Sequence, residues 1–216
     1  MSLFLCIFVT LTIGFEFYRG VRARCRAHGE LIYQAFFRLI FKNQRRYGGY
    51  IVHFAIVLIF MGITGNAFNK ETQGEVKQGE SVSIGAYTLH CERIFEGQGS
   101  TYSYLAAELV VTKNGRPLGT LTPEKRYYAA SEQPTSEVAL HSTLVEDLYT
   151  VFAGMTDDGE RAVIQLFLNP LVAWVWIGTL VMVFGTIIAI LPDARDTKIQ
   201  RSKKQLERLL KSTEKI

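Results

Sequence analysis

The chain has 216 residues, 48% of them hydrophobic, and a formal net charge of +4. This charge does not indicate nucleic-acid binding, because residues 69–168 carry eight Lys and Arg against fourteen Asp and Glu, a balance of −6, so the flanks together carry +10. Basic residues beside apolar segments are typical of membrane proteins. The cysteines, Cys6, Cys25 and Cys91, include no CxxC pair, which excludes a thioredoxin-type site and a c-type haem attachment site.

The first apolar segment is expected to be a transmembrane helix over residues 1–18. It could instead be the core of a signal peptide, but no basic residue precedes it and no small-x-small cleavage site follows it. A strongly basic loop, residues 19–46, comes next. Near-helical spacing within this loop predicts a helix lying in the membrane interface, although the same residues could serve only topology and lipid anchoring. The apolar residues of that helix are Leu31, Ile32, Phe36, Leu39 and Ile40.

Two further segments have the length of about 20 residues that a membrane span needs. No Asp, Glu, Lys or Arg occurs over residues 47–69, which predicts the second transmembrane helix. The third is predicted over residues 168–192, with Asn169 as its N-cap and Pro170 at its first helical position. A basic tail, residues 193–216, follows. Because short loops rich in Lys and Arg stay in the cytoplasm, we expect the basic loop and the tail to be cytoplasmic.

The acidic stretch over residues 70–167 predicts a β-domain on the other side of the membrane. Residues 81–84 and 87–90 alternate between polar and apolar side chains, and Asn114-Gly115 between two alternating runs predicts a hairpin with a type I′ turn. The expected fold class is therefore a membrane protein with three transmembrane α-helices. An all-β extracytoplasmic domain, a sandwich or an open barrel, lies between the second and third helices.

His53 is the candidate functional residue of the second span. An ionisable side chain within a membrane helix is costly and indicates a functional site. Gly49 lies one turn earlier and Gly48 beside it, so a flat group could approach the backbone there, and imidazole is a common axial ligand of haem iron. The alternative is a neutral histidine hydrogen-bonded to another helix. The other histidines, His28, His90 and His141, lie outside the spans, so a second ligand would come from another chain.

Three other groups have both a functional and a structural interpretation. Lys125 and Arg126 could pair with propionates or an acidic partner, or be solvated charges at a strand end. Trp174 and Trp176 fit an aromatic belt at the headgroup level better than porphyrin stacking. His90 and Cys91 are adjacent, and adjacent strand residues point to opposite faces, so they make a poor metal site.

Five motifs follow one another along the chain: Arg45-Arg-Tyr-Gly-Gly-Tyr-Ile-Val-His53, Pro123-Glu-Lys-Arg-Tyr127, Thr135-x-Glu137-Val-Ala139, Asp147-Leu-Tyr149 and Asn169-Pro-Leu-Val-x-Trp-x-Trp-x-Gly178. In this order they resemble the C-terminal part of CcmF, the haem lyase subunit of bacterial and plant mitochondrial cytochrome c maturation. The resemblance covers most of residues 45–192. It implies that His53 is one axial ligand of a haem b held between membrane helices.

The resemblance also implies partners and a location. The partners are an N-terminal CcmF portion or subunit, a haem-delivering chaperone, other maturation proteins and apocytochrome c. The location is the bacterial inner membrane, with the β-domain in the periplasm. The tryptophan-rich segment of CcmF and its second haem b ligand have no counterpart here, so we expect a split subunit or a truncated product that does not ligate haem alone. The alternative function is a structural assembly subunit without haem contact.

Overall fold

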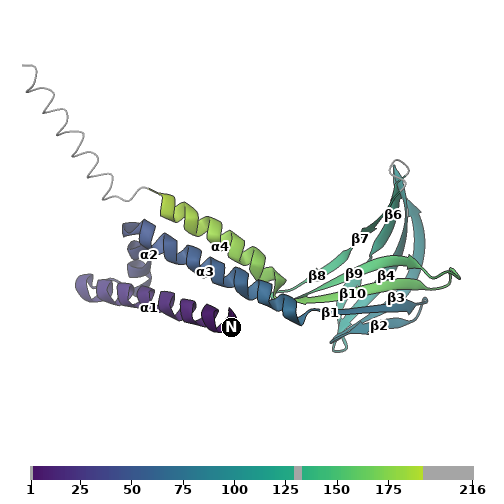
Figure 1. Ribbon diagram of the computed structural model, residues 1–216, viewed down its shortest axis with the longest axis horizontal. Coiled ribbons are helices and arrows are strands. Elements are labelled where there is room, and N and C mark those ends of the chain that lie inside the picture. The colour runs from purple at the N-terminus through teal and green to yellow at the C-terminus, as the bar shows by residue number, and fades with distance from the viewer. Residues whose placement is uncertain (1, 129–132, 192–216) are drawn as a thin grey trace, which may run out of the picture. The chain divides into compact units, whose positions relative to one another are not determined.

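The computed structural model describes residues 2–128 and 133–191 (Figure 1). The described residues divide into a helical unit, formed by residues 2–61 and 175–191, and a β-domain within residues 62–174. The predicted tail, residues 193–216, lies outside the described residues.

Four helices are described: α1 (Ser2–His28), α2 (Ile32–Lys42), α3 (Gln44–Gly65, continued by the short helix η1, Asn66–Phe68) and α4 (Val172–Ile190). Three helical segments are long and apolar enough to cross a membrane: Phe4–His28, Gln44–Phe68 and Val172–Ile190. The first helix runs ten residues beyond the predicted end at residue 18. Its basic residues therefore extend the helix instead of beginning a loop.

The predicted start of the third span is wrong. Asn169 and Pro170 end strand β10 (Ala162–Pro170), where they pair with Asp147 and Glu146, and the helix begins only at Val172. The ladder with the neighbouring strand holds these two residues in extended conformation. Proline is tolerated there because a strand end does not need its missing N–H.

Glycines bring α3 and α4 into direct backbone contact, and the two helices run side by side (Figure 1). A Cβ on Gly178 would lie 2.9 Å from the carbonyl oxygen of Ala55, and one on Gly185 would lie 3.0 Å from the amide nitrogen of Val52. A Cβ on Gly48 would lie 2.7 Å from the amide nitrogen of Ala189. Small residues allow such close approach between membrane helices, where dispersion and not hydrophobicity drives association.

Helix α1 covers a second face of α3. The ring of Phe17 lies 5.1 Å from that of Tyr47, and the carboxylate of Glu16 accepts a hydrogen bond from Arg46 at 2.7 Å. Near the other end of α1, Cys6 Sγ lies 3.9 Å from the carbonyl oxygen of Val57. These contacts span about three turns of α3, so α1 packs along much of its length.

The predicted amphipathic helix is α2, which buries Ala35, Leu39 and Ile40. The turn before it is held by Glu30, whose carboxylate accepts hydrogen bonds from Arg24 and Arg38 at 2.9 and 2.8 Å. These bonds hold the pKa of Glu30 at about 2, so the carboxylate is ionised at neutral pH. The basic segment therefore has a defined structure of its own.

The β-domain consists of two antiparallel sheets over its described residues. One has the order β1 (Lys70–Val76), β10, β9 (Glu146–Met155) and β8 (Ala139–Ser142). The other has the order β2 (Ser81–Ile84), β3 (Tyr87–Gln98), β4 (Tyr102–Lys113), β6 (Glu124–Tyr128) and β7 (Pro134–Glu137), with β5 (Arg116–Leu121) also paired to β4. Alternate residues of both sheets bury one shared core, which includes Leu89, Leu109, Phe152 and Leu166.

The predicted hairpin joins β4 to β5. Lys113 pairs with Arg116, and the two turn residues have positive φ, 50° at Asn114 and 77° at Gly115. A type I′ turn requires this conformation at both positions, and Asn-Gly adopts it at least cost. The hairpin prediction is confirmed.

The helix contact leads to a stability prediction. Replacing Gly178 with valine should destabilise the helical unit by about 1–3 kcal/mol, because the side chain would collide with the α3 backbone. The measurement is SDS-induced unfolding of the purified chain in mixed micelles. Gly14→Val in α1 is the matched control, since a Cβ there meets nothing within 4 Å. Equal loss in both variants would show that the α3–α4 contact is not specific.

Candidate functional site

The candidate site is centred on His53 in α3. Its Nδ1 lies 2.8 Å from the carbonyl oxygen of Gly49, one turn earlier in the same helix. A carbonyl can only accept, so Nδ1 carries the proton and donates it. Nε2 then holds a lone pair, and no partner for it is found among the described residues. The histidine is therefore satisfied on one side and available as a ligand on the other.

His53 lies on the face of α3 that the described helices of this chain leave open. Gly49, His53, Ile56 and Phe60 recur at helical spacing, and Ile56 and Phe60 are 37% and 53% exposed. A Cβ on Gly49 would meet nothing within 4 Å. A flat group could therefore approach the helix backbone beside the imidazole.

The predicted part of Gly48 in this approach is wrong. Gly48 is buried, and its missing side chain makes room for Ala189 of α4. Adjacent residues of a helix point about 100° apart, so Gly48 and Gly49 serve different faces. Only Gly49 belongs to the open face.

The donor set fits an axial haem ligand better than a bare-metal site. Among the described residues, no group of three or more His, Cys, Asp or Glu side chains is placed to hold a metal ion. Haem iron takes its equatorial ligands from the porphyrin and needs only one imidazole from each side. Hydrogen bonding of Nδ1–H to a backbone carbonyl is also the usual way in which a ligating histidine is oriented.

Lys125 and Arg126 are partly buried and paired within the β-domain. Lys125 Nζ donates a hydrogen bond to the carbonyl oxygen of Ala153 in the facing sheet. Arg126 donates to Glu124 at 3.0 Å and to Glu137 at 3.3 Å. Its guanidinium also lies 4.8 Å from the ring centroid of Tyr102. Both charges therefore join strands within the β-domain.

The other candidate residues from the sequence, His90, Cys91, Trp174 and Trp176, do not form a shared site. His90 is exposed and bonded to Ser81 at 3.0 Å, while Cys91 is completely buried, which raises the pKa of its thiol. Trp174 donates its indole N–H to the carbonyl oxygen of Leu144 at 2.9 Å, and Trp176 is 70% exposed. The structure brings none of these residues together into a site.

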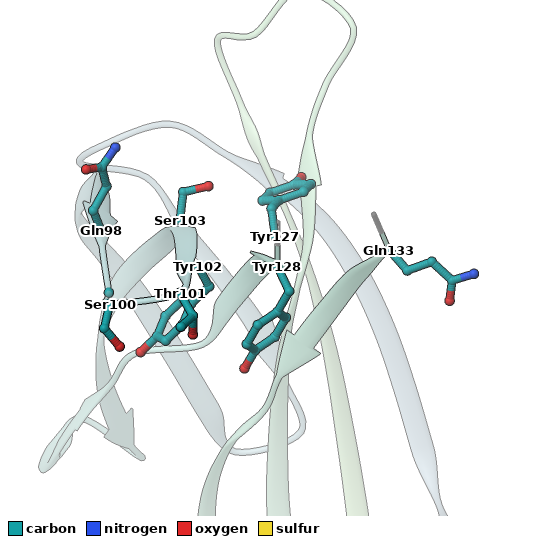
Figure 2. Close-up of a pocket in the computed structure, with 9 residues that line it drawn as sticks. Gln98, Ser100, Thr101, Tyr102, Ser103, Tyr127, Tyr128 and Gln133 are labelled. Atoms are coloured by element: carbon teal, nitrogen blue, oxygen red, sulfur yellow. The ribbon is translucent and has the colours of Figure 1, made fainter. Parts of the chain in front are cut away.

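The sequence did not single out a shallow cleft of about 520 Å³ in the β-domain. Figure 2 shows side chains of the β3–β4 turn on one side and Tyr127 and Tyr128 of β6 on the other. The rings of Tyr102 and Tyr128 lie 5.2 Å apart. The lining is uncharged and consists of Gln98, Gly99, Ser100, Thr101, Tyr102, Ser103, Tyr127, Tyr128 and Gln133.

Comparisons with known proteins agree with this fold. The family model described as the CcmF C-terminal beta-sandwich matches residues 67–170. The cytochrome c-type biogenesis protein CcmF of Haemophilus influenzae is 29% identical over 174 residues, which are 80% of this chain and 24% of that protein. The chain is a relative of the C-terminal part of CcmF. It spans about a quarter of the length of the curated relatives that it matches.

Other CcmF relatives extend the comparison. The cytochrome c-type biogenesis protein CycK of Rhizobium meliloti is 30% identical over 145 residues, which are 67% of this chain and 21% of that protein. A solved structure titled Cytochrome c Heme Lyase CcmF superposes with a TM-score of 0.61 at 19% identity, over 85% of this chain and 34% of that one. That likeness shows the shared fold: apolar helices with a β-sandwich between the last two.

The contacts of Arg126 in this CcmF relative lead to a stability prediction. Arg126→Ala should lower the thermal unfolding midpoint of the β-domain by a few degrees, because it removes two ion pairs and a ring contact that join three strands. The midpoint is measured by circular dichroism in detergent. Arg116→Ala, an exposed position on β5, is the control and should unfold like the original chain. A normal midpoint in Arg126→Ala combined with lost cytochrome maturation would support the partner-contact hypothesis instead.

Proposed function

We propose that this chain forms the C-terminal part of a CcmF-type haem lyase and that His53 is an axial ligand to a haem b. One observation carries the proposal: the imidazole is oriented by Gly49 and presents Nε2 on the one face of α3 that α1 and α4 leave open. The role in cytochrome c biogenesis rests on the relatives. The role of His53 rests on this geometry and on the motif that ends at this residue.

The haem would be shared with an upstream CcmF portion or a second chain. His53 would supply one ligand to the iron. Of the remaining histidines, His28 is the last residue of α1, and His90 and His141 lie in strands β3 and β8. The second ligand therefore comes from an N-terminal CcmF portion or subunit whose helices cover the open face of α3. The bound haem supplies one-electron chemistry. Of the residues of this chain, His53 would hold the iron, and Gly49 would leave space for the porphyrin beside it.

A location and a set of partners belong to the same proposal. The chain lies in the bacterial inner membrane with the β-domain in the periplasm, where haem is joined to apocytochrome c. The basic residues of α1, α2 and the tail lie at the cytoplasmic side. A haem-delivering chaperone and apocytochrome c are the partners of the assembled complex.

A structural role is the second candidate. The bond from His53 to Gly49 satisfies half of the imidazole within its own helix, which lowers the cost of burying a neutral histidine. On this hypothesis the chain assembles the complex without touching haem. The two candidates differ in what happens to the haem when the imidazole is removed.

The haem prediction concerns His53→Ala. The variant should insert normally, because alanine is a good helix former, but the complex with the N-terminal portion should contain markedly less haem b. Haem is measured by the pyridine haemochrome spectrum after co-purification. Added imidazole should restore part of it, since the lost side chain leaves a space of the same shape. His28→Ala is the control and should keep full haem, and a full low-spin spectrum in His53→Ala would rule out ligation.

The orientation prediction uses engineered cysteines. Native Cys91 cannot report, because its thiol is buried. In a cysteine-free background, Ser100→Cys in the exposed β3–β4 turn should react with a membrane-impermeant maleimide in intact spheroplasts. Ser212→Cys, in the basic tail beyond the described residues, should react only after the membrane is opened. The reverse pattern would overturn the proposed orientation.

A further inference from the structure

The β8–β9 turn exposes two aliphatic side chains that the β-domain itself does not bury. Leu144 is 61% exposed and Val145 is 65% exposed. Thr143, which lies between the end of β8 and Leu144, closes the turn. Its hydroxyl donates to the carbonyl oxygen of Glu146 at 2.7 Å and accepts from the amide of Glu146 at 3.1 Å. The turn is therefore ordered, and its apolar tip is a fixed feature of the surface.

The turn is hydrogen-bonded to the residues that begin α4. The amide of Leu171 donates to the carbonyl oxygen of Val145 at 2.8 Å. The indole of Trp174, in the first turn of the helix, donates to the carbonyl oxygen of Leu144 at 2.9 Å. These two bonds hold Leu144 and Val145 at the level where an apolar, membrane-length helix starts.

The end of α3 reaches the same place. A Cβ on Gly65 would lie 2.2 Å from the carbonyl oxygen of Pro170 and 3.0 Å from Cβ of Leu171. Phe68, just beyond, is 63% exposed. The segment that leaves α3 at Gly65 and the segment that enters α4 at Leu171 are therefore adjacent. The β8–β9 turn lies beside the second of them.

Glu146, the acidic residue that directly follows the turn, is held away from its tip. Glu146 accepts hydrogen bonds from Lys113 at 2.7 Å and from Tyr87 at 3.0 Å. Burial alone would raise the pKa of Glu146. The bonds from Lys113 and Tyr87 outweigh that effect and leave the pKa below its usual value, so the carboxylate stays ionised and bound to the domain. The tip itself presents only Leu144 and Val145.

We propose that Leu144 and Val145 insert into the lipid bilayer at its interface and form a third attachment of the β-domain to the membrane, beside the two helices. The surface is small, apolar and uncharged, and it is tied to a helix that enters the hydrocarbon. Trp174, which holds the turn, is the residue type enriched at the headgroup level. Transfer of a Leu or Val side chain from water into an apolar medium is favourable, so a bilayer can cover these two side chains without any partner protein.

The test uses the full chain in lipid nanodiscs without any partner. In a cysteine-free background, Leu144→Cys is labelled with an environment-sensitive fluorophore, and Ser100→Cys is the control. Strand β4 separates the two ends of the domain by about 37 Å, from Tyr102 near the control to Lys113 near the turn. Emission is quenched in turn by brominated lipids and by aqueous iodide.

Lipid insertion predicts a blue-shifted probe at position 144 that brominated lipids quench. Its iodide quenching constant should be at least about threefold below that at position 100, because the bilayer excludes the anion. Adding Val145→Asp should restore iodide access at position 144 while circular dichroism and the unfolding midpoint stay unchanged, since the site is exposed. If positions 144 and 100 respond alike in nanodiscs, the lipid contact is wrong. Protection that arises only when the N-terminal CcmF portion is added would assign the surface to a protein instead.

Discussion

The close approach of α3 to α4 is the contact on which the candidate site depends. Gly48, Gly178 and Gly185 let the two backbones meet, and this fixes the rotation of α3 about its axis. With α1 on a second face through Tyr47 and Val57, the remaining face can only be the one that carries His53. A single larger residue in the glycine contact would turn that face or separate the helices, so packing on another face of α3 decides where the imidazole points.

In the β-domain, charged side chains link strands within one sheet and between the two sheets. Lys125 reaches across the core to Ala153, and Arg126 joins Glu124 and Glu137 on the outer face of its own sheet. These contacts give both residues of the family motif a structural role within the domain. The cleft near Tyr127 is uncharged (Figure 2). The turn at Leu144 and Val145 exposes apolar side chains.

Sequence patterns predicted the features that arise from local chemistry. The charge-free run around His53, the Asn114-Gly115 turn and the opposite directions of His90 and Cys91 all follow from neighbours in the chain, and the structure shows them. The errors come from tertiary pairing. Asn169 and Pro170 have the chemistry of a helix start, yet the ladder to β9 keeps them extended. Gly48 and Gly49 look equivalent in sequence, and only the position of α4 distinguishes them. The cleft joins two strand pairs distant in sequence, so no local pattern could reveal it.

Axial ligation by His53 can be observed directly through the nitrogen nuclei around the iron. This chain is labelled with ¹⁵N-histidine, assembled with an unlabelled N-terminal CcmF portion, and examined in the ferric state by pulsed electron–nuclear spectroscopy. The account predicts one strongly coupled ¹⁵N from an axial imidazole and one axial ¹⁴N from the other chain, with the ¹⁵N coupling lost in His53→Ala. Two axial ¹⁴N nuclei in the labelled complex would contradict it.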